Sequence, residues 1–237
     1  MSPGARAAPL LEARVGPARV WCTGRAQGNV ADHVGDDPEV VARNRAALAA
    51  RMPADDPRAW VWLRQEHGAV VHVATGPNPH PAPVADAVVT TVPGLALAVV
   101  AADCAPLVVA CDDAVGVVHA GHRGVASGVI EATIAALRDI GTGDVRVFLA
   151  PCIRAEHYEF GSGDLAPFVA RFGPEVESRT RDGRPALDIP AAIRIVCERA
   201  GVVAFDDCRR DTAASDEYFS YRRRAESGRQ ATIAILS

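Results

Sequence analysis

Hydrophobic residues recur along this chain in short runs that suit buried β-strands. Four such runs follow one another at residues 86–92, 95–102, 106–111 and 115–119, with Pro93-Gly94 and Asp112-Asp113 at turns between them. Apolar runs of this length, bounded by turn residues, are typical of strands that are covered on both faces. The same reasoning predicts further strands at 19–23, 59–63, 70–74, 145–149 and 232–236.

A second pattern predicts three helices. Pro38 suits the first turn of a helix that Asp36 or Asp37 can cap. Two more helices are predicted at residues 124–140 and 189–200, and each of them is followed by a glycine. Strands and helices mix without a strict strand–helix–strand rhythm, which favours a mixed sheet layered with helices over a Rossmann fold.

Composition and charge restrict the class of protein. The chain has 237 residues, of which 49% are hydrophobic and 23% charged, as in an ordinary globular protein. Its formal charge of −4 gives no electrostatic reason to expect nucleic acid as a partner. No apolar run approaches the roughly 20 residues that a membrane span needs, and residues 1–18 contain no compact apolar segment of a signal peptide. We therefore expect a cytoplasmic protein without membrane or nucleic-acid partners, and its oligomeric state stays open.

The cysteines do not form a recognisable pattern. There are six of them, and none belongs to a Cys-x-x-Cys pair. Their spacing resembles neither a zinc ribbon nor a small disulfide scaffold. We expect six free thiols, most of them small buried side chains of the core.

Reactive side chains gather at the ends of predicted strands in three segments, 65–68, 102–104 and 119–124. The first contains His67, the second Cys104 and the third His119. Residues at strand ends face loops and clefts, where they serve function more often than residues in the middle of a strand. These three residues are therefore the main candidates for chemistry.

A hairpin is expected to bring two of the three together. The runs 106–111 and 115–119 are joined by a short turn, so the chain returns antiparallel and His119 comes back near Cys104. Pro106 is expected to bend the chain or interrupt strand pairing. With His67 added, the set can hold a zinc ion through three protein ligands and leave one position open. The same residues can instead form a Cys/His nucleophilic pair, or be ordinary core and surface residues.

The segment 119–124 also offers a place for an anion. The predicted helix after Gly124 presents free backbone N–H groups at its start, and Arg123 lies beside them. Arg123 is therefore the candidate for binding phosphate, although it can equally be a surface charge beside a turn. Asp103 and Glu66 are candidates for a proton donor because each is adjacent to a proposed ligand.

Seven segments in chain order resemble motifs of the YfiH-like family, also called the multicopper polyphenol oxidoreductase or laccase-like family. The resemblance extends over most of the chain. The segments are Asn44-Arg45 (NR), 65–68 (QxHG), 86–90 with Pro93-Gly94 (DALVT…PG), 103–106 (ADCxP), 119–124 (HAGWRG), 151–153 with Tyr158-Glu159 (GPxI…YEV), and 218–223 with 227–229 (FFSYRRDGxTGR). One such match would mean little, but all of them in order make the assignment specific.

The resemblance implies a fold, a site and an activity. The fold is α/β, with mixed β-sheets layered with helices in an α/β/β/α-type sandwich, as one domain over residues 1–237. The family's zinc ligands correspond to His67, Cys104 and His119, which would also be the catalytic residues. The implied activity is that of a purine nucleoside phosphorylase acting on adenosine, inosine and S-methyl-5′-thioadenosine, with adenosine deaminase activity. Its partners would be purine nucleosides and phosphate.

Two rival activities accompany the resemblance, and the sequence departs from the family pattern in places. The rivals are a copper-dependent polyphenol oxidase, with copper in place of zinc, and a Cys/His hydrolase that edits peptidoglycan precursors. A full multicopper cluster is hard to build, because the chain has seven histidines and no His-x-His pair. His122 stands where the family usually has Trp and can alter the substrate preference or join the site. The other departures are Ala101, Ala150 and Arg154-Ala155.

Overall fold

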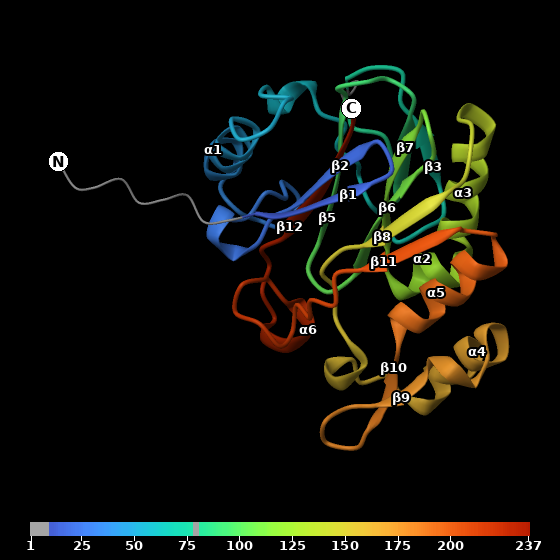
Figure 1. Ribbon diagram of the computed structural model, residues 1–237. Helices are drawn as coiled ribbons and strands as arrows, with labels where there is room; N and C mark the ends of the chain where they lie inside the picture. Colours follow the sequence, from blue (N-terminus) through green and yellow to red (C-terminus); the bar gives the residue numbers. More distant parts are fainter. Residues whose placement is uncertain (1–9, 78–80) are drawn as a thin grey trace.

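Two β-sheets packed face to face form the centre of the computed structural model, which describes residues 10–77 and 81–237 (Figure 1). The smaller sheet has four antiparallel strands in the order β1-β2-β12-β5. Their bounds are Leu11–Val15 (β1), Ala18–Cys22 (β2), Gln230–Leu236 (β12) and Ala96–Ala101 (β5). The strand β12 therefore lies between two strands that precede it by more than a hundred residues.

The larger sheet has six strands in the order β11-β8-β6-β7-β4-β3. Their bounds are Ala204–Asp207 (β11), Arg146–Leu149 (β8), Ala105–Ala110 (β6), Val115–Ala120 (β7), Ala87–Thr90 (β4) and Val71–Val73 (β3). The outer pairs β11–β8 and β3–β4 are parallel, whereas the inner pairs are antiparallel. The sheet is thus mixed, as the sequence predicted.

Helices cover the outer faces of both sheets (Figure 1). Helix α1 (Pro38–Ala49) packs on the four-stranded sheet, and the side chain of Asp37 caps it by accepting from the N–H of Glu39. The opposite layer consists of α2 (His122–Ser127), α3 (Val129–Ile140), α4 (Ser162–Phe172) and α5 (Ile189–Arg199). The smaller elements are α6 (Tyr221–Arg224), the hairpin of β9 (Glu177–Arg179) and β10 (Pro185–Leu187), and the 3-10 turns Arg25–Gln27 (η1), Pro57–Ala59 (η2), Ala155–His157 (η3) and Pro174–Val176 (η4).

Three buried hydrophobic clusters correspond to the three interfaces between these layers. In β5, Leu97 and Val99 face the larger sheet, whereas Ala98 and Val100 face α1. This alternation follows from the two-residue period of a strand and divides one apolar run between two cores. The third cluster joins the larger sheet to α3, α4 and α5. The order helix, sheet, sheet, helix confirms the predicted α/β/β/α sandwich.

Three predictions about local structure were wrong. The predicted helix 124–140 is two helices, because Gly128 adopts a left-handed conformation with φ 88° that separates α2 from α3. Residues 59–63 do not form a strand: only Val61 forms a bridge, with Leu97, at the free edge of β5. Pro106 does not interrupt the ladder between β6 and β7, since it pairs with His119.

The sequence did not predict several elements that the structure contains. They are β1, α4, β9, β10, β11 and α6. The other predicted strands and helices are present, and where bounds were predicted they differ by at most two residues.

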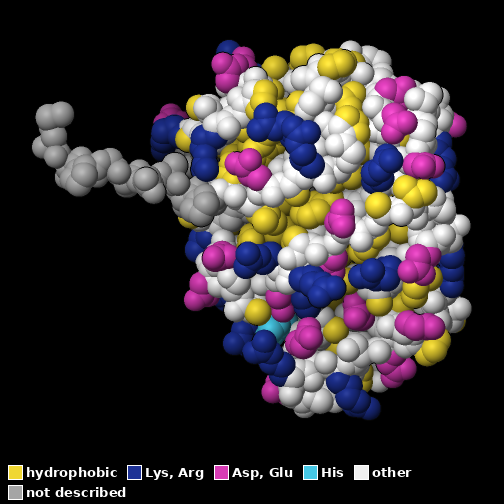
Figure 2. Space-filling model, viewed as in Figure 1, with side chains coloured by type: hydrophobic (Ala, Val, Ile, Leu, Met, Phe, Trp, Pro, Cys, Tyr) yellow, Lys and Arg dark blue, Asp and Glu magenta, His cyan; other side chains and the backbone are white. Residues whose placement is uncertain are grey.

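The surface and the cysteines complete the description. On the face shown in Figure 2, arginine and acidic side chains are interspersed around a central hydrophobic area, and neither sign forms a continuous patch there. Over the described residues, no helix has the length and apolar character needed to cross a bilayer. Part of the segment examined for a signal peptide, residues 1–9, lies outside the described residues. All six cysteines are unpaired.

Candidate functional site

The three predicted ligand residues come together at one end of the larger sheet. Cys104 immediately precedes β6, and the register Pro106↔His119 brings β7 back beside it, so the predicted hairpin is confirmed. His67 reaches the same place from the loop before β3. Each of the three residues offers one ligand atom, and these atoms lie within 4.8 Å of one another. Cys104 Sγ lies 3.8 Å from His67 Nε2.

A fourth residue, Asp86, organises this cluster. Its carboxylate accepts the backbone N–H groups of Glu66, His67 and Gly68 at 3.2, 2.8 and 2.7 Å. The same carboxylate lies 2.8 Å from Nδ1 of His119. Because Nδ1 is engaged there, Nε2 of His119 is the ring nitrogen left for the site. Asp86 is 1% exposed, so this contact is buried and fixes both the loop of His67 and the ring of His119.

Unusual backbone conformations accompany two of the site segments. His67 has φ 61° and Asp103 has φ 91°, in the region that side chains other than glycine rarely adopt. Each such residue costs of order 1–3 kcal/mol and persists only where its surroundings enforce it. Asp86 enforces the conformation at His67. At Asp103, the carboxylate accepts from the Thr212 hydroxyl at 2.7 Å and from the backbone N–H of Arg222 at 2.6 Å.

Close contact with the cluster favours glycine at position 121. A Cβ atom built on Gly121 would lie 3.0 Å from Cys104 Sγ and 3.0 Å from His67 Cδ2. Its φ of −68° is open to any residue, so space and not backbone strain excludes a side chain here. The motif glycine between His119 and His122 thus lets the β7–α2 turn pass directly under the two ligands.

Charges within the cluster favour a thiolate beside an imidazolium when no metal is bound. Burial disfavours ionisation of Cys104, but His119 and His67 outweigh it and lower the pKa of this thiol to about 6. Burial also opposes protonation of His119, yet Cys104 and Asp86 raise its pKa to about 9. Despite its burial, the pKa of Asp86 is lowered, because His119 and the backbone N–H groups stabilise the carboxylate. The thiolate is a nucleophile and a metal ligand, and a bound metal ion would take the place of the His119 proton.

The spacing of the ligand atoms is compatible with a tetrahedral metal ion. A tetrahedral ion about 2.3 Å from a thiolate and about 2.0 Å from an imidazole nitrogen separates these two atoms by about 3.5 Å. The observed separation between Cys104 Sγ and His67 Nε2 is 3.8 Å. Among the described residues this is the one group of three or more His, Cys, Asp or Glu side chains with ligand atoms so close together. A metal ion would thus find three ligands here.

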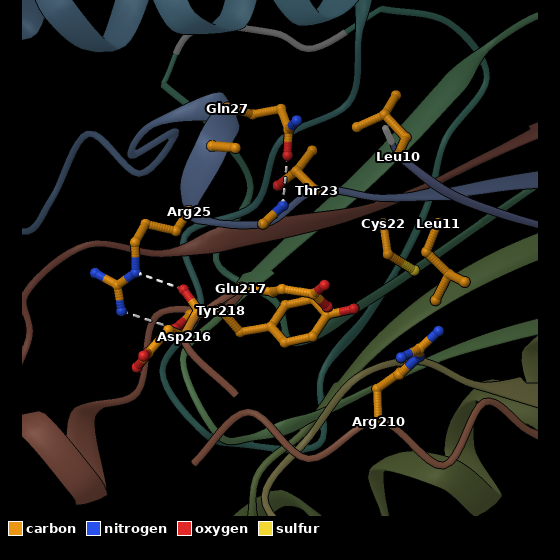
Figure 3. Close-up of a pocket in the computed structure, with 12 residues that line it drawn as sticks. Leu10, Leu11, Cys22, Thr23, Arg25, Gln27, Arg210, Asp216, Glu217 and Tyr218 are labelled. Carbon is orange, nitrogen blue, oxygen red and sulfur yellow. Dashed lines mark hydrogen bonds between the residues drawn. The ribbon is translucent and has the colours of Figure 1, made fainter. Parts of the chain in front are cut away.

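The cluster opens into a cavity of about 540 Å³. Ala101 and Ala102 at the end of β5, together with Gln65, form part of its wall. Other wall residues come from distant segments. Tyr221, Ser227 and Arg229 belong to the last of the family motifs, although the sequence assigned them no role in the site, and the others are His33, Val34 and Ala225. A second cavity of about 500 Å³ is lined by residues such as Cys22, Arg210 and Tyr218 (Figure 3), and contains none of the three ligand residues.

Three other residues that the sequence singled out, Asp103, Glu66 and Arg123, lie outside the cluster. Asp103 is 7% exposed, and its carboxylate is bound to Thr212 and Arg222, so it does not face the cavity as a proton donor. Glu66 forms a surface ion pair with Arg64 at 3.0 Å. Arg123 is exposed in the first turn of α2 and is not among the residues that line the cavity.

His122 packs against aromatic residues behind the site. Its ring meets the edge of Phe160 with 5.3 Å between centroids, and its Nδ1 lies 3.1 Å from the hydroxyl of Tyr158. His122 does not belong to the group of three ligand residues. It therefore occupies the position of the expected Trp as part of an aromatic cluster, half-buried beside α4.

The chain is similar to known proteins both in sequence and in structure. The family model described as multi-copper polyphenol oxidoreductase laccase matches residues 21–237. A relative from Streptomyces coelicolor, named purine nucleoside phosphorylase, is 39% identical over 214 residues, or 88% of this chain and 87% of that protein. A solved structure from Neisseria meningitidis superposes with a TM-score of 0.83 at 28% identity, covering 96% of this chain and 99% of its own. For YlmD from Geobacillus stearothermophilus the TM-score is 0.81 at 27% identity, with 92% and 91% covered.

Proposed function

This chain belongs to the family described as multi-copper polyphenol oxidoreductase laccase, and from that membership we propose that it is a purine nucleoside phosphorylase with adenosine deaminase activity. The proposed nucleosides are adenosine, inosine and S-methyl-5′-thioadenosine, with phosphate as the second substrate. Relatives named purine nucleoside phosphorylase, 34–39% identical to this chain, support the reaction class. The observation that carries the proposal is the cluster of His67, Cys104 and His119 inside a cavity whose size suits a small ligand.

We further propose zinc as the metal, with His67, Cys104 and His119 as its ligands. Two imidazoles and a thiolate with one open position are typical of catalytic rather than structural zinc. Bound zinc supplies a Lewis acid that can activate water at neutral pH. Asp86 supports this role by holding the ring of His119 and the loop of His67. His67 is the exposed member of the cluster and therefore the ligand nearest to an entering substrate.

The two proposed reactions differ in their nucleophile. In phosphorolysis, a phosphate oxygen bonds to C1′ of the ribose as the bond from C1′ to the purine nitrogen breaks. The electron pair of that bond stays on the purine, and the proton of hydrogen phosphate ends on the released base. In deamination, water replaces the amino group at C6 of adenosine, which leaves as ammonia. The chain must therefore bind the nucleoside in one position and admit either phosphate or water.

Two alternative activities each have a specific observation in their favour. The family description names copper, and thiolate with imidazole also suits copper ions. Against a multicopper oxidase stands the single cluster of potential ligands in the described part of the chain. The lowered pKa of Cys104 beside His119 would equally suit a nucleophilic hydrolase, the activity proposed above for peptidoglycan precursors.

One experiment separates these possibilities. Purified protein is analysed for zinc and copper and then incubated with adenosine, inosine or S-methyl-5′-thioadenosine, with and without phosphate. We expect about one zinc per chain, base release only with phosphate, and inosine formation from adenosine in both buffers. Metal-replete protein that converts no nucleoside but oxidises a phenol would instead establish the copper oxidase. The same assay tests the assignment of Arg123 to phosphate, which requires Arg123→Ala to weaken base release more than deamination.

A further inference from the structure

Among the described residues that line the cavity of the three ligands, one is an arginine. This residue is Arg229, which directly precedes β12. The register Gln230↔Ala101 places Arg229 opposite Ala102, two residues before Cys104. Arg229 and Ala102, which are 127 positions apart in the chain, are thus neighbours at the cavity.

One edge of the Arg229 guanidinium is hydrogen-bonded to the backbone, and the other edge makes no hydrogen bond to any described residue. Its Nη1 donates to the carbonyl oxygens of Glu226, Ser227 and Gly228 at 3.1, 2.7 and 3.0 Å. The ring of Tyr221 lies beside it, 5.8 Å from centroid to Cζ. Nε and Nη2 make no hydrogen bond to any residue in the described ranges 10–77 and 81–237. The N–H groups of Nε and Nη2 point to the same side of the guanidinium, and this edge matches two oxygens of a phosphate or carboxylate.

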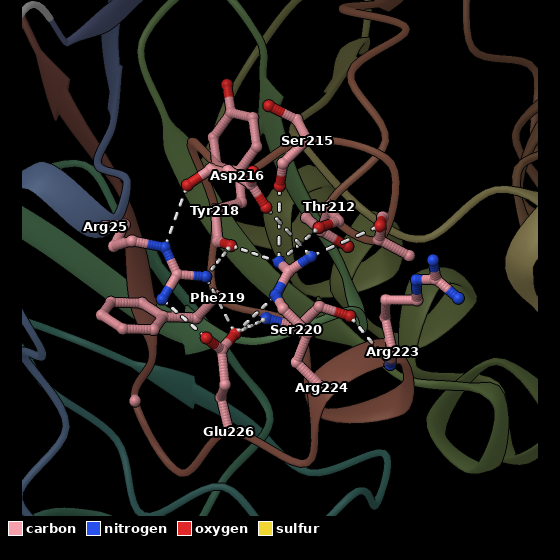
Figure 4. A network of polar contacts seen from close by, with 12 residues as sticks. Arg25, Thr212, Ser215, Asp216, Tyr218, Phe219, Ser220, Arg223, Arg224 and Glu226 are labelled. Atoms are coloured by element: carbon pink, nitrogen blue, oxygen red, sulfur yellow. Dashed lines mark hydrogen bonds and ion pairs between the residues drawn. The ribbon is translucent and has the colours of Figure 1, made fainter.

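Two sets of contacts fix the segment that positions this side chain. Glu226 accepts from both Arg25 and Arg224, at 2.6 and 3.1 Å, and also from the backbone N–H of Ser220 (Figure 4). These contacts, led by the hydrogen bond from Arg25, lower the pKa of Glu226 to about 2, so it stays ionised at neutral pH. The segment around Arg229 is therefore tied by charge to η1.

A second set of contacts reaches the backbone of Arg229 itself. Asn29 Oδ1 accepts its N–H at 2.9 Å. The loop of Asn29 is in turn held by Asn44, whose amide donates to the Asn29 carbonyl at 2.8 Å, and by Arg45, which donates to the Val30 carbonyl at 2.8 Å. The two helix residues Asn44 and Arg45 thus support the cavity wall from behind.

We propose that Arg229 binds the phosphate substrate through its Nε and Nη2 edge, an inference that rests on the proposed function. A phosphate dianion that enters this cavity meets a wall made largely of uncharged side chains. It needs a fixed positive partner there, and a pre-positioned arginine supplies one at little entropic cost. Arg123, the candidate from the sequence, is exposed and outside the cavity lining.

The test compares Arg229→Gln and Arg229→Lys with Arg223→Gln as the control. Arg223 is an exposed arginine of the same segment, so its substitution changes the net charge equally without touching the cavity lining. Initial rates are measured with phosphate varied at saturating inosine and with inosine varied at saturating phosphate. Binding of inorganic phosphate is measured separately by calorimetry. Circular dichroism and the melting temperature report whether each variant is folded.

We expect Arg229→Gln to raise the KM for phosphate roughly 10- to 100-fold and leave the KM for inosine within about threefold. The KM of Arg229→Lys for phosphate should lie between that of the wild type and that of Arg229→Gln, because lysine keeps the charge but not the paired donors. Lysine can still donate to the surrounding carbonyls, so Arg229→Lys decides the matter if Arg229→Gln does not fold. An unchanged KM for phosphate, or equal rises in both KM values, would overturn the inference. The inference would also be overturned if Arg123→Ala raised the KM for phosphate and neither Arg229 variant did.

The same measurements separate this inference from the proposed function. If the wild-type protein releases base with phosphate but its phosphate KM is independent of Arg229, the inference fails and the proposed function stands. If the wild-type protein converts no nucleoside, yet binds inorganic phosphate in calorimetry and loses that binding in Arg229→Lys, the oxyanion site stands and the proposed reaction fails.

Discussion

Asp86 and His119 are joined by a contact of 2.8 Å between a carboxylate oxygen and Nδ1, and the same oxygen accepts the backbone N–H of His67. One buried carboxylate therefore orients two of the three proposed ligands. It acts on His119 through the ring and on His67 through the backbone. Contacts of this kind fix the tautomer of a metal-binding histidine and raise its basicity.

From this relationship we expect Asp86→Asn to weaken metal binding. The amide nitrogen of asparagine cannot accept the N–H groups that Asp86 now binds, so the loop of His67 loses part of its support. A loss of 10- to 100-fold in zinc affinity is expected, measured by competition with a chromophoric chelator. Asp188→Ala is the control: it removes the cap of α5 and costs about 1 kcal/mol, but lies away from the cluster. Wild-type zinc affinity in Asp86→Asn would show that the carboxylate does not support the ligands.

Cys104 is expected to be essential for holding the metal. Elemental analysis of Cys104→Ala should find little zinc, because two histidines alone make a weak site. Cys208→Ala serves as the matched control, since Cys208 is also partly exposed but lies outside the cluster. If Cys104→Ala retained zinc at the wild-type level, the proposed ligand set would be wrong.

The thiol of Cys104 should remain reactive at unusually low pH in metal-free protein. Its pKa is lowered to about 6, so the thiolate predominates above that pH and is protonated as the pH falls through it. The rate of alkylation by iodoacetamide should therefore be flat near pH 7 and fall about tenfold per unit well below pH 6. Burial raises the pKa of Cys22 and Cys197 to about 12, so these thiols should react far more slowly.

Peptide mass spectrometry assigns each modified cysteine. A midpoint for Cys104 near the ordinary thiol value would contradict the predicted influence of His119 and His67. In His119→Ala the midpoint should move upward, because the strongest positive neighbour of the thiolate is gone. Adding zinc to the wild-type protein should protect Cys104 from the reagent.

Gly121→Ala should damage the cluster without unfolding the protein. The added methyl group would lie 3.0 Å from both Cys104 Sγ and His67 Cδ2, so the ligands must move apart. Zinc occupancy and activity are expected to fall at least about tenfold, since small displacements at a site cost this much. Gly163→Ala is the control, because no heavy atom lies within 4 Å of the position of its Cβ. Full zinc occupancy in Gly121→Ala would mean that the turn yields without disturbing the ligands.

Local patterns predicted a mixed sheet layered with helices and the ligand hairpin, because both depend on short-range features, whereas the sandwich of two sheets was implied by the family resemblance. The turn at Asp112-Asp113 and the apolar runs on either side determine the register that brings His119 beside Cys104. The break at Gly128 was missed, since an isolated glycine within a helical pattern is often tolerated. Helix α4 was missed as well; it contains Pro167, which weakens a helical pattern.

The rest of the site depends on contacts between distant segments, which no local pattern contains. Asp86 stands before an apolar strand, where an acidic residue resembles an ordinary turn residue. Its partners are 18 to 33 positions away in the chain. Tyr221 and Arg229 reach the cavity only because β12 pairs with β5, more than a hundred residues earlier. A resemblance to family motifs identified these segments but not what they contact.

The position of β12 between β2 and β5 also governs when this protein can fold. Both of its neighbours leave the ribosome long before residues 230–236 are made, and they share no ladder with each other. Until that strand arrives, β2 and β5 each present an unpaired edge, which is the kind of surface that promotes aggregation of nascent chains. Folding of the smaller sheet therefore waits for β12, and chaperones that shield strand edges should matter for this chain until residues 230–236 are made.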